Sequence, residues 1–221
     1  MTNPQITILD YGINNSKSVR MAFNHVGRSV EVVTNGADLD EPDAMVLPGI
    51  GAFGKAMEEL RDRNLIEPIQ DHVEAGRPML GICLGMQLLL TRSSEFGQHR
   101  GLDLIPGTVA RFESAASVSI PHYKVPHMGW NEIYPPEGKP DGYWEGTLLE
   151  QSEPNANCYF VHSFYADPDD PGDVLAVGEY FGQTFTAVVK SGAVVGTQFH
   201  PEKSGRVGLQ ILETFCKISG L

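Results

Sequence analysis

The sequence predicts an α/β fold, a three-layer sandwich with a mixed, largely parallel central sheet. In the first half, short runs rich in β-branched residues alternate with amphipathic helical stretches, which is the pattern of βα units. In the second half, extended runs dominate. The chain has 221 residues, of which 41% are apolar and 20% charged, and this fits one compact globular unit. We therefore expect a single domain over residues 1–221.

The first half predicts alternating strands and helices. Val19, Phe23 and Val26 recur at helical spacing, and Gly27 is placed to end that helix. Gly76 ends a later helix in the same way. The expected strands are 6–11, 30–34, 44–47 and 78–82, and the further expected helices are 52–63, 65–75 and 84–91.

The second half predicts strands and one closing helix. Ser204 is expected to cap this helix, whose buried side carries Val207, Ile211, Leu212 and Phe215. Stretches rich in Ser, Pro and Gly are expected to form surface loops. The expected strands are 107–112, 131–134, 158–165, 174–180, 184–190 and 193–199, and the expected loops are 113–125 and 135–146.

The charge balance and the cysteines exclude several classes of function. The 16 Lys and Arg against 28 Asp and Glu give a formal net charge of −12, so a broad cationic surface for nucleic acid or anionic lipid is not expected. The start of the sequence lacks a signal-peptide pattern, and no apolar run is long enough to span a bilayer. We expect a soluble, cytoplasmic protein. Its three cysteines lack CxxC spacing, so neither a disulfide framework nor a thiolate metal site is expected.

One cysteine lies in a pattern typical of a nucleophile. Cys83 falls between Gly81 and Gly85, at the predicted junction of a strand and a helix. This is the spacing of a nucleophile elbow with Cys in place of Ser, in which small flanking residues let neighbouring backbone approach closely. We expect the sulfur to be exposed at the start of the helix, where a nearby imidazolium would favour the thiolate. Cys158 and Cys216 lie in ordinary strand and helix patterns and are interpreted as buried hydrophobic residues.

A thiolate nucleophile needs a general base and a group that orients it, and His200 is the best candidate base. His200 and Glu202 lie two residues apart in an extended run, so their side chains share one face. Pro201 between them indicates the end of a strand, where the active-site residues of parallel sheets gather. The zinc-deaminase signature and the H-E-x-x-H metalloprotease pattern are both absent, so no metal is predicted.

A glycine-rich loop precedes the second expected helix. Residues 49–54 match G-x-G-x-x-G in form, but the loop does not follow the first strand and Asp71 falls in a helix, so a dinucleotide site is disfavoured. We interpret Gly49, Ile50 and Gly51 as part of an oxyanion hole, with the backbone N–H of Leu84 as a second donor.

Taken together, the runs Gly-Ile-Cys-Leu-Gly-Met-Gln, Pro-Gly-Ile-Gly and Gln-Phe-His-Pro-Glu-Lys-Ser resemble the class I glutamine amidotransferases. The resemblance covers nearly the whole chain. It implies that Cys83, His200 and Glu202 form a triad that hydrolyses the side-chain amide of glutamine, that no cofactor is needed, and that Gln87 and Glu95 hold the substrate.

Within this family, the resemblance is strongest to glutaminase subunits of histidine biosynthesis. These form a heterodimer with a (β/α)₈-barrel cyclase subunit, which receives the ammonia. The resemblance implies that Asn15, Trp130, Tyr159 and Lys203 lie at the subunit interface, although composition alone would favour a core position for Trp130.

Two alternatives stay open at the level of the sequence. Residues 10–16 read Asp-Tyr-Gly-Ile-Asn-Asn-Ser, where the family usually has Asp-Tyr-Gly-x-Gly-Asn-Leu, and the loop over 113–124 is long. These departures would also fit a paralogous amidotransferase subunit whose ammonia aminates a sugar precursor. A stand-alone cysteine hydrolase of γ-glutamyl compounds would use the same triad without a partner.

Overall fold

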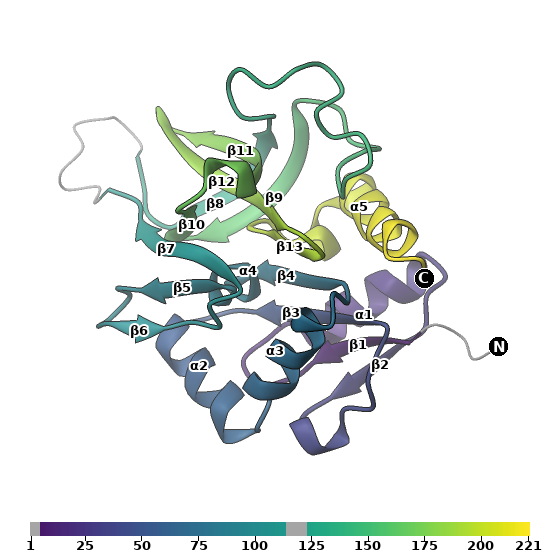
Figure 1. Cartoon of the computed structure of the whole chain (residues 1–221). Coiled ribbons are helices and arrows are strands. Elements are labelled where there is room, and N and C mark those ends of the chain that lie inside the picture. The colour runs from purple at the N-terminus through teal and green to yellow at the C-terminus, as the bar shows by residue number, and fades with distance from the viewer. Residues whose placement is uncertain (1–4, 114–122) are drawn as a thin grey trace.

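The computed structural model describes residues 5–113 and 123–221, and a seven-stranded mixed sheet lies at its centre (Figure 1). Most of the predicted loop 113–125 and its His122 therefore lie outside the described residues. The strand order is β11-β12-β13-β4-β3-β1-β2. The neighbours from β13 to β2 pair in parallel, and β12 pairs antiparallel with both β11 and β13. The strands are β1 (Ile6–Leu9), β2 (Val30–Val33), β3 (Ala44–Gly49), β4 (Met79–Cys83), β11 (Val174–Tyr180), β12 (Gln183–Ser191) and β13 (Val194–Thr197).

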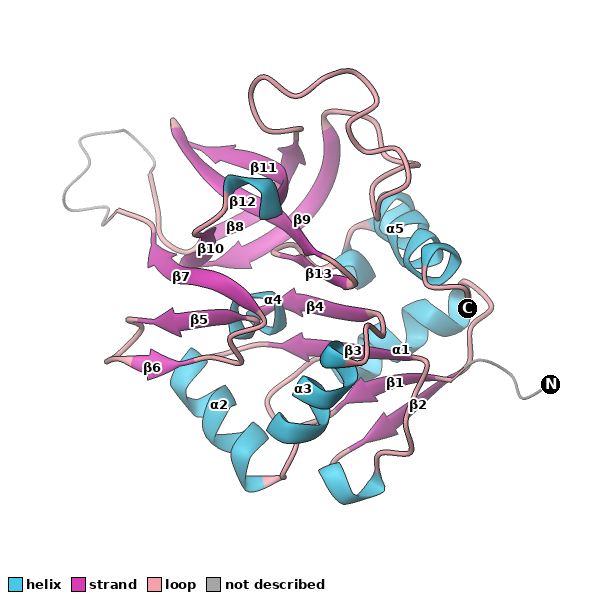
Figure 2. Ribbon diagram, viewed as in Figure 1, coloured by secondary structure: helices cyan, strands magenta, loops and turns pink. Residues whose placement is uncertain are grey.

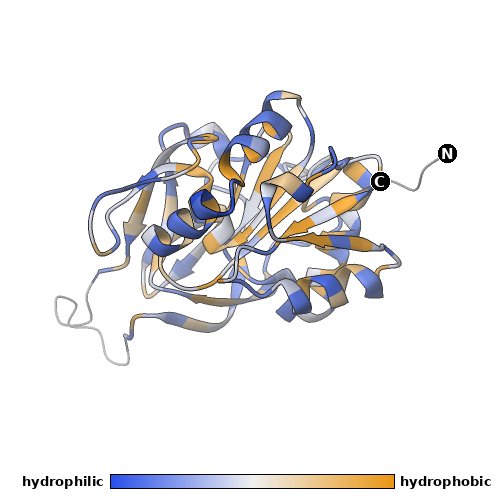
Figure 3. Cartoon of the chain, turned by 90° about the horizontal axis from the view of Figure 1, so that it is seen from below, coloured by the Kyte–Doolittle hydropathy of each residue, from blue (hydrophilic) through white to orange (hydrophobic). Residues whose placement is uncertain are grey.

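Helices cover both faces of this sheet, which confirms the predicted three-layer arrangement (Figure 2). The helices α1 (Ser16–His25) and α5 (Gly205–Ile218) pack with one core, and α2 (Phe53–Asp62) and α3 (Ile66–Glu74) pack with the other. Side chains of a strand point alternately to its two faces. In β3, Val46 accordingly joins the first core, whereas Met45 and Leu47 join the second. In Figure 3, apolar strands lie between helices that carry polar residues on their outer sides.

Two smaller sheets stand beside the central one. The first has four strands in the order β10-β7-β5-β6, and the second is the antiparallel hairpin of β8 and β9. Short 3₁₀ turns also occur, among them η3, which follows the last strand. The bounds are β5 (Leu90–Ser93), β6 (His99–Arg100), β7 (Ile105–Arg111), β8 (His127–Ile133), β9 (Ala156–His162), β10 (Phe164–Pro168), η1 (Gly36–Asp38), η2 (Pro171–Asp173) and η3 (Pro201–Lys203).

The small sheets correct two predicted elements. The helix expected over 84–91 ends early, because α4 covers only Leu84–Leu88 and Leu90 already pairs with Ile105 of β7. The strand expected over 158–165 divides at Ser163 into β9 and β10, which belong to different sheets. An apolar run does not by itself distinguish helix from buried strand, and the pairing partners decide between them.

The predicted Ser204 side-chain cap is also wrong, whereas the predicted surface loop 135–146 is confirmed except at Trp144. Ser204 is the N-terminal residue before α5, but its side chain makes no cap bond to that helix and instead links two other backbone groups. The stretch 135–146 is a series of turns, yet its Trp144 is buried and its indole N–H donates to the Leu175 carbonyl at 2.9 Å. Buried tryptophan needs such an acceptor, and tertiary packing provides it.

The sheet brings the predicted site residues to one edge. Gly49 ends β3 and pairs in register with Cys83 at the end of β4, and the chain after β13 leads directly to His200. Because these strands are parallel, their carboxyl ends lie together, which is where ligands bind in open α/β sheets.

Candidate active site

Cys83 lies on a strained turn between β4 and α4. Its backbone angles are φ 56° and ψ −111°, outside the regions that most residues prefer. A Cβ atom added to Gly85 would lie 1.7 Å from the Leu47 carbonyl oxygen, and one added to Gly81 would lie 2.8 Å from the Met86 backbone. Both glycines are therefore required by close backbone contacts, which confirms the elbow predicted from their spacing.

The sulfur is less accessible than the sequence analysis expected. Cys83 is only 6% exposed, because β9 covers it: the Val161 carbonyl oxygen lies 4.0 Å from Sγ. The Gln198 side-chain amide also lies near, with Nε2 3.7 Å from Sγ. The sulfur lines a partly open cavity rather than lying on the outer surface.

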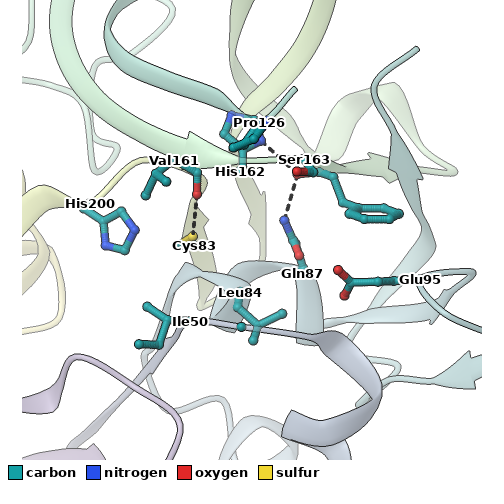
Figure 4. Close-up of a pocket in the computed structure, with 12 residues that line it drawn as sticks. Ile50, Cys83, Leu84, Gln87, Glu95, Pro126, Val161, His162, Ser163 and His200 are labelled. Atoms are coloured by element: carbon teal, nitrogen blue, oxygen red, sulfur yellow. Dashed lines mark hydrogen bonds between the residues drawn. The ribbon is translucent and has the colours of Figure 1, made fainter. Parts of the chain in front are cut away.

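His200 and Glu202 form a buried pair beside this cysteine. His200 Nδ1 lies 2.8 Å from Glu202 Oε1, and each side chain is about 1% exposed. Figure 4 shows the imidazole on the same side of the cavity as Cys83. Burial by itself lowers the pKa of His200, but the Cys83 sulfur and the Glu202 carboxylate raise it to about 10. The site therefore favours the protonated form of the His200 imidazole.

Asn15 contributes a further contact to this pair. Its side-chain amide donates to Glu202 Oε1 at 2.9 Å, from the turn before α1. Burial raises the pKa of Glu202, and the bonds from His200 and Asn15 outweigh it, so the pKa is lowered overall. The sequence analysis placed Asn15 at a subunit interface and missed this contact, which joins residues 187 positions apart.

A cavity of about 310 Å³ opens between these groups (Figure 4). Cavities of this size hold small molecules. Gln87 and Glu95, predicted as substrate ligands, both line it. Gln87 Nε2 donates to the Phe164 carbonyl at 2.9 Å and to Gln198 Oε1 at 3.0 Å, and Glu95 Oε2 accepts the backbone N–H of Phe53 at 2.7 Å. The cavity is lined by Ile50, Gly51, Cys83, Leu84, Gln87, Glu95, Pro126, Val161, His162, Ser163, Phe164 and His200.

The predicted oxyanion loop lies beside Cys83 as expected. Ile50, Gly51 and Leu84 line the cavity, while Gly49 pairs with Cys83 in the sheet. A Cβ added to Gly49 would lie 2.5 Å from the Tyr11 hydroxyl, so only glycine fits there. In this structure the Ile50 N–H donates to the Ile13 carbonyl at 3.3 Å, which gives it a partner within the chain.

Trp130, Tyr159 and Lys203 form a cluster next to the site, which we call the Trp130 cluster. Trp130 is 59% exposed, which contradicts a core position, and its ring meets that of Tyr159 edge-on at 6.0 Å. Lys203 Nζ lies 5.9 Å from the centre of the Tyr159 ring. The Tyr159 carbonyl accepts the His200 N–H at 2.9 Å, so the cluster is bonded to the backbone of the site.

The two remaining cysteines do not line this cavity. Cys158 and Cys216 are buried, and burial raises the pKa of their thiols to about 12 and about 11. Among residues 5–113 and 123–221, no group of three or more His, Cys, Asp and Glu side chains could hold a metal ion. In the same two segments, no helix combines the length and the apolar character that crossing a membrane requires.

Comparison with known families is consistent with this geometry. The family model for glutamine amidotransferase class I matches residues 7–218. The chain belongs to the class I glutamine amidotransferase family. The match takes in the elbow, the glycine loop and the run from His200 to Glu202.

Relatives of this class I glutamine amidotransferase are similar over nearly their whole length. A Legionella pneumophila protein named imidazole glycerol phosphate synthase subunit HisH 1 is 46% identical, with 96% of this chain and 99% of the relative covered. A Chlorobaculum tepidum protein named imidazole glycerol phosphate synthase subunit HisH is 38% identical over the same shares. These relatives confirm the resemblance inferred from the motifs.

Solved structures show the same fold at low identity. A crystal structure of a glutamine amidotransferase matches with a TM-score of 0.73 and 16% identity, covering 98% of this chain and 99% of that one. The structure of PurLQS from Thermotoga maritima matches with a TM-score of 0.70 and 18% identity, over the same shares of the two chains.

Proposed function

We propose that this chain is the glutaminase subunit of an imidazole glycerol phosphate synthase, which hydrolyses glutamine to glutamate and ammonia. One observation carries the chemistry: Cys83, on its strained turn, lines the same cavity as His200, whose other ring nitrogen is held by Glu202. The relatives named HisH support the pathway, since the similarity spans nearly all of both chains.

The first half of the reaction is an acyl transfer to sulfur. The Cys83 thiolate attacks the γ-carbonyl carbon of glutamine, and a C–S bond forms as the carbonyl oxygen becomes an oxyanion. His200, protonated on the nitrogen that faces the cavity, then gives its proton to the leaving nitrogen, and ammonia departs as the C–N bond breaks. Glu202 keeps the imidazole oriented and stabilises its positive charge.

The second half returns the enzyme to its starting state. Neutral His200 takes a proton from water, the hydroxide adds to the thioester carbon, and the C–S bond breaks to release glutamate and the thiolate. The oxyanion of both steps needs N–H donors. We assign these to Leu84 and to the loop of Gly49, Ile50 and Gly51, with the Ile50 N–H exchanging its Ile13 partner for the substrate oxygen.

The cavity walls explain how glutamine would be held. Both Nε2 hydrogens of Gln87 are used within the protein, so Gln87 offers its Oε1 acceptor to a substrate N–H group. Glu95 uses one oxygen to bind the Phe53 N–H at the start of α2, which fixes the carboxylate in place. Its other oxygen would accept from the α-ammonium group of glutamine.

A partner completes the proposed function. We propose a heterodimer with a HisF-type (β/α)₈-barrel cyclase subunit, which docks over the Trp130 cluster and receives the ammonia in histidine biosynthesis. The exposure of Trp130 supports this, since tryptophan is enriched among the residues that contribute most to binding energy at protein interfaces. The chemistry needs no metal, flavin or nucleotide, and the role predicts a cytoplasmic protein.

The test is glutamine hydrolysis by the purified chain, alone and with the HisF-type subunit of the same organism. Cys83→Ala should lower ammonia release from glutamine by at least about a thousandfold. Cys216→Ala removes a buried thiol far from the cavity and is the matched control, which should keep its activity. With the barrel subunit present, added ammonium should restore product formation by the Cys83→Ala complex.

Two outcomes would contradict the proposal. A Cys83→Ala variant that retained most of its glutaminase activity would exclude the triad. Full activity of the chain alone, unchanged by the barrel subunit, would instead favour a stand-alone γ-glutamyl hydrolase.

A further inference from the structure

A buried chain of hydrogen bonds connects the β8–β9 hairpin with the wall of the active-site cavity. His127 of β8 and His162 of β9 are directly opposite each other in the hairpin, and their rings meet through Nδ1 of His127 and Nε2 of His162 at 3.0 Å. They are 2% and 6% exposed. The catalytic scheme above uses neither ring.

The partners at both ends fix which group donates in each of these hydrogen bonds. A carbonyl oxygen only accepts, so His162 Nδ1, 2.8 Å from the Phe164 carbonyl, must carry the proton. Nε2 of a neutral His162 is then an acceptor, and His127 Nδ1 donates to it. His127 Nε2 accepts in turn from the Asn131 amide at 3.3 Å.

The Asn131 amide is itself held in one orientation. Its oxygen accepts the Glu132 N–H at 2.8 Å, and its nitrogen donates to the Glu179 carbonyl, also at 2.8 Å. Burial lowers the pKa of His127 to about 4 and that of His162 to about 3, so both rings are neutral at pH 7. Each ring therefore has one permitted tautomer, with the proton on Nδ1.

This series of hydrogen bonds ends on groups that form the cavity. The Phe164 carbonyl that accepts from His162 also accepts from Gln87, which is bonded to Gln198 next to the Cys83 sulfur. His162, Ser163 and Phe164 all line the cavity. If His127 did not donate, His162 could move its proton to Nε2, and the Phe164 carbonyl would lose its histidine donor.

We propose that His127 is a positioning residue for the glutamine site: by donating to His162, it fixes the tautomer that holds the Phe164 carbonyl and, through it, Gln87. This rests on the proposed glutaminase function and adds a residue outside the cavity to its substrate-binding apparatus. His127 touches no substrate. Its ring packs against Phe160 and Tyr180, at 5.1 and 4.2 Å between ring centres.

The test compares three variants of the full chain in complex with the barrel subunit. His127→Leu removes the donor and should raise the KM for glutamine about tenfold while kcat changes less than about twofold. His127→Asn places an amide N–H near the position of Nδ1 and should restore most of the affinity. Tyr180→Leu removes an aromatic neighbour of His127 that takes no part in the chain of hydrogen bonds. This variant should lower stability without raising KM.

Two measurements need no turnover and separate this inference from the proposed function. Nitrogen-15 spectra of the histidines should show both rings as Nδ1–H tautomers in the native chain, with the His162 signal changed in His127→Leu and preserved in His127→Asn. Calorimetry in a Cys83→Ala background should show the same order of glutamine affinities as the KM values.

The inference is overturned if the native spectra show Nε2–H tautomers, or if His127→Leu binds glutamine as well as the native chain. It is also overturned if Tyr180→Leu weakens glutamine binding as much as His127→Leu does. A native complex that binds glutamine but does not hydrolyse it would contradict the proposed function instead.

Discussion

Cys83 has two unfavourable features, one of its backbone and one of its side chain, that a cysteine with a purely structural role would not need. Its positive φ angle costs an ordinary residue about 1–2 kcal/mol, and its side chain is set among the polar groups of a cavity wall. Such strain persists where the surroundings determine it, here through the glycines on either side. At this position the strain directs the sulfur into the cavity shared with His200.

Asn15 provides the first prediction at the scale of single residues. Its amide donates to Glu202 Oε1, the same oxygen that His200 Nδ1 contacts, and a hydrogen bond to a charged group contributes about 1.5–3 kcal/mol. Asn15→Ala should therefore lower kcat for glutamine hydrolysis by tenfold or more, on the order of that energy. The measurement is steady-state kinetics with the barrel subunit at saturation.

Ser16→Ala is the control for Asn15→Ala, because Ser16 is the next residue and bonds to Asp10 rather than to the triad. If Asn15→Ala weakened only the affinity for the barrel subunit and left kcat unchanged at saturation, Asn15 would be an interface residue alone.

The buried histidines predict a dependence of stability on pH. A histidine with a folded-state pKa below 6.5 binds protons more readily when unfolded, so the free energy of unfolding decreases as the pH falls from about 6.5 to about 4. His127→Gln removes one such group. Its loss of stability between pH 7 and pH 5 should be smaller than that of the native chain by about 2 kcal/mol, measured by urea unfolding. An equal loss in both proteins would contradict a neutral buried His127.

Among the elements, the turn from β4 into α4 depends most on backbone contact. The helix has only five residues, so its position relies on its packing rather than on its own hydrogen bonds. Gly85 contacts the Leu47 carbonyl so closely that no side chain fits between them. This contact joins β3, which leads into the glycine loop, to the second residue after Cys83.

Gly85→Ala should destabilise the protein by about 3 kcal/mol or more, because the strand and the helix would have to separate. The measurement is the midpoint and slope of chemical unfolding. Gly76→Ala is the control: Gly76 has a positive φ, unlike Gly85, but a Cβ there meets nothing within 4 Å, so its cost should stay near 1–2 kcal/mol. Similar losses in both variants would mean that the contact at Gly85 can relax.

At the scale of the whole molecule, two different sheets form the two sides of the site. The central sheet supplies Cys83 and the glycine loop at its carboxyl edge, and the β8–β9 hairpin covers the sulfur and carries Trp130 on its outer surface. The Tyr159 carbonyl bonds to His200, and the Ser204 hydroxyl bonds to both the Tyr159 N–H and the His200 carbonyl. A partner bound to the hairpin would therefore contact an element whose backbone is hydrogen-bonded to that of His200.

Trp130→Ala should weaken binding of the barrel subunit while leaving the stability of the protein nearly unchanged. Since the indole is exposed, its loss should change the free energy of unfolding by no more than about 0.5 kcal/mol. The affinity for the barrel subunit should fall at least about tenfold, as expected for a central interface tryptophan. Titration of glutaminase activity with the barrel subunit measures this.

Ile218→Ala is the control for Trp130→Ala, because Ile218 is an exposed apolar residue at the far end of α5. A Trp130→Ala variant that bound and responded to the barrel subunit like the native chain would place the interface elsewhere.

The local sequence predicted those features that depend on short-range constraints. Two glycines around one cysteine indicated the elbow, since only residues without Cβ allow that backbone approach. The two-residue spacing of His200 and Glu202 indicated their pairing, although a 3₁₀ turn rather than a strand brings them together. The alternation of strand and helix indicated the layers, because each buried face needs a partner.

Short-range patterns thus indicated a candidate nucleophile, a candidate base and the carboxylate beside that base, together with the layered fold that carries them. Long-range packing added four features that these patterns do not show: β9 covers the sulfur, Asn15 reaches Glu202, residues after Leu88 form a strand, and two neutral histidines connect the hairpin to Gln87. These depend on pairs of residues far apart in the chain, whose meeting is determined by packing and by the need of every buried polar group for a partner.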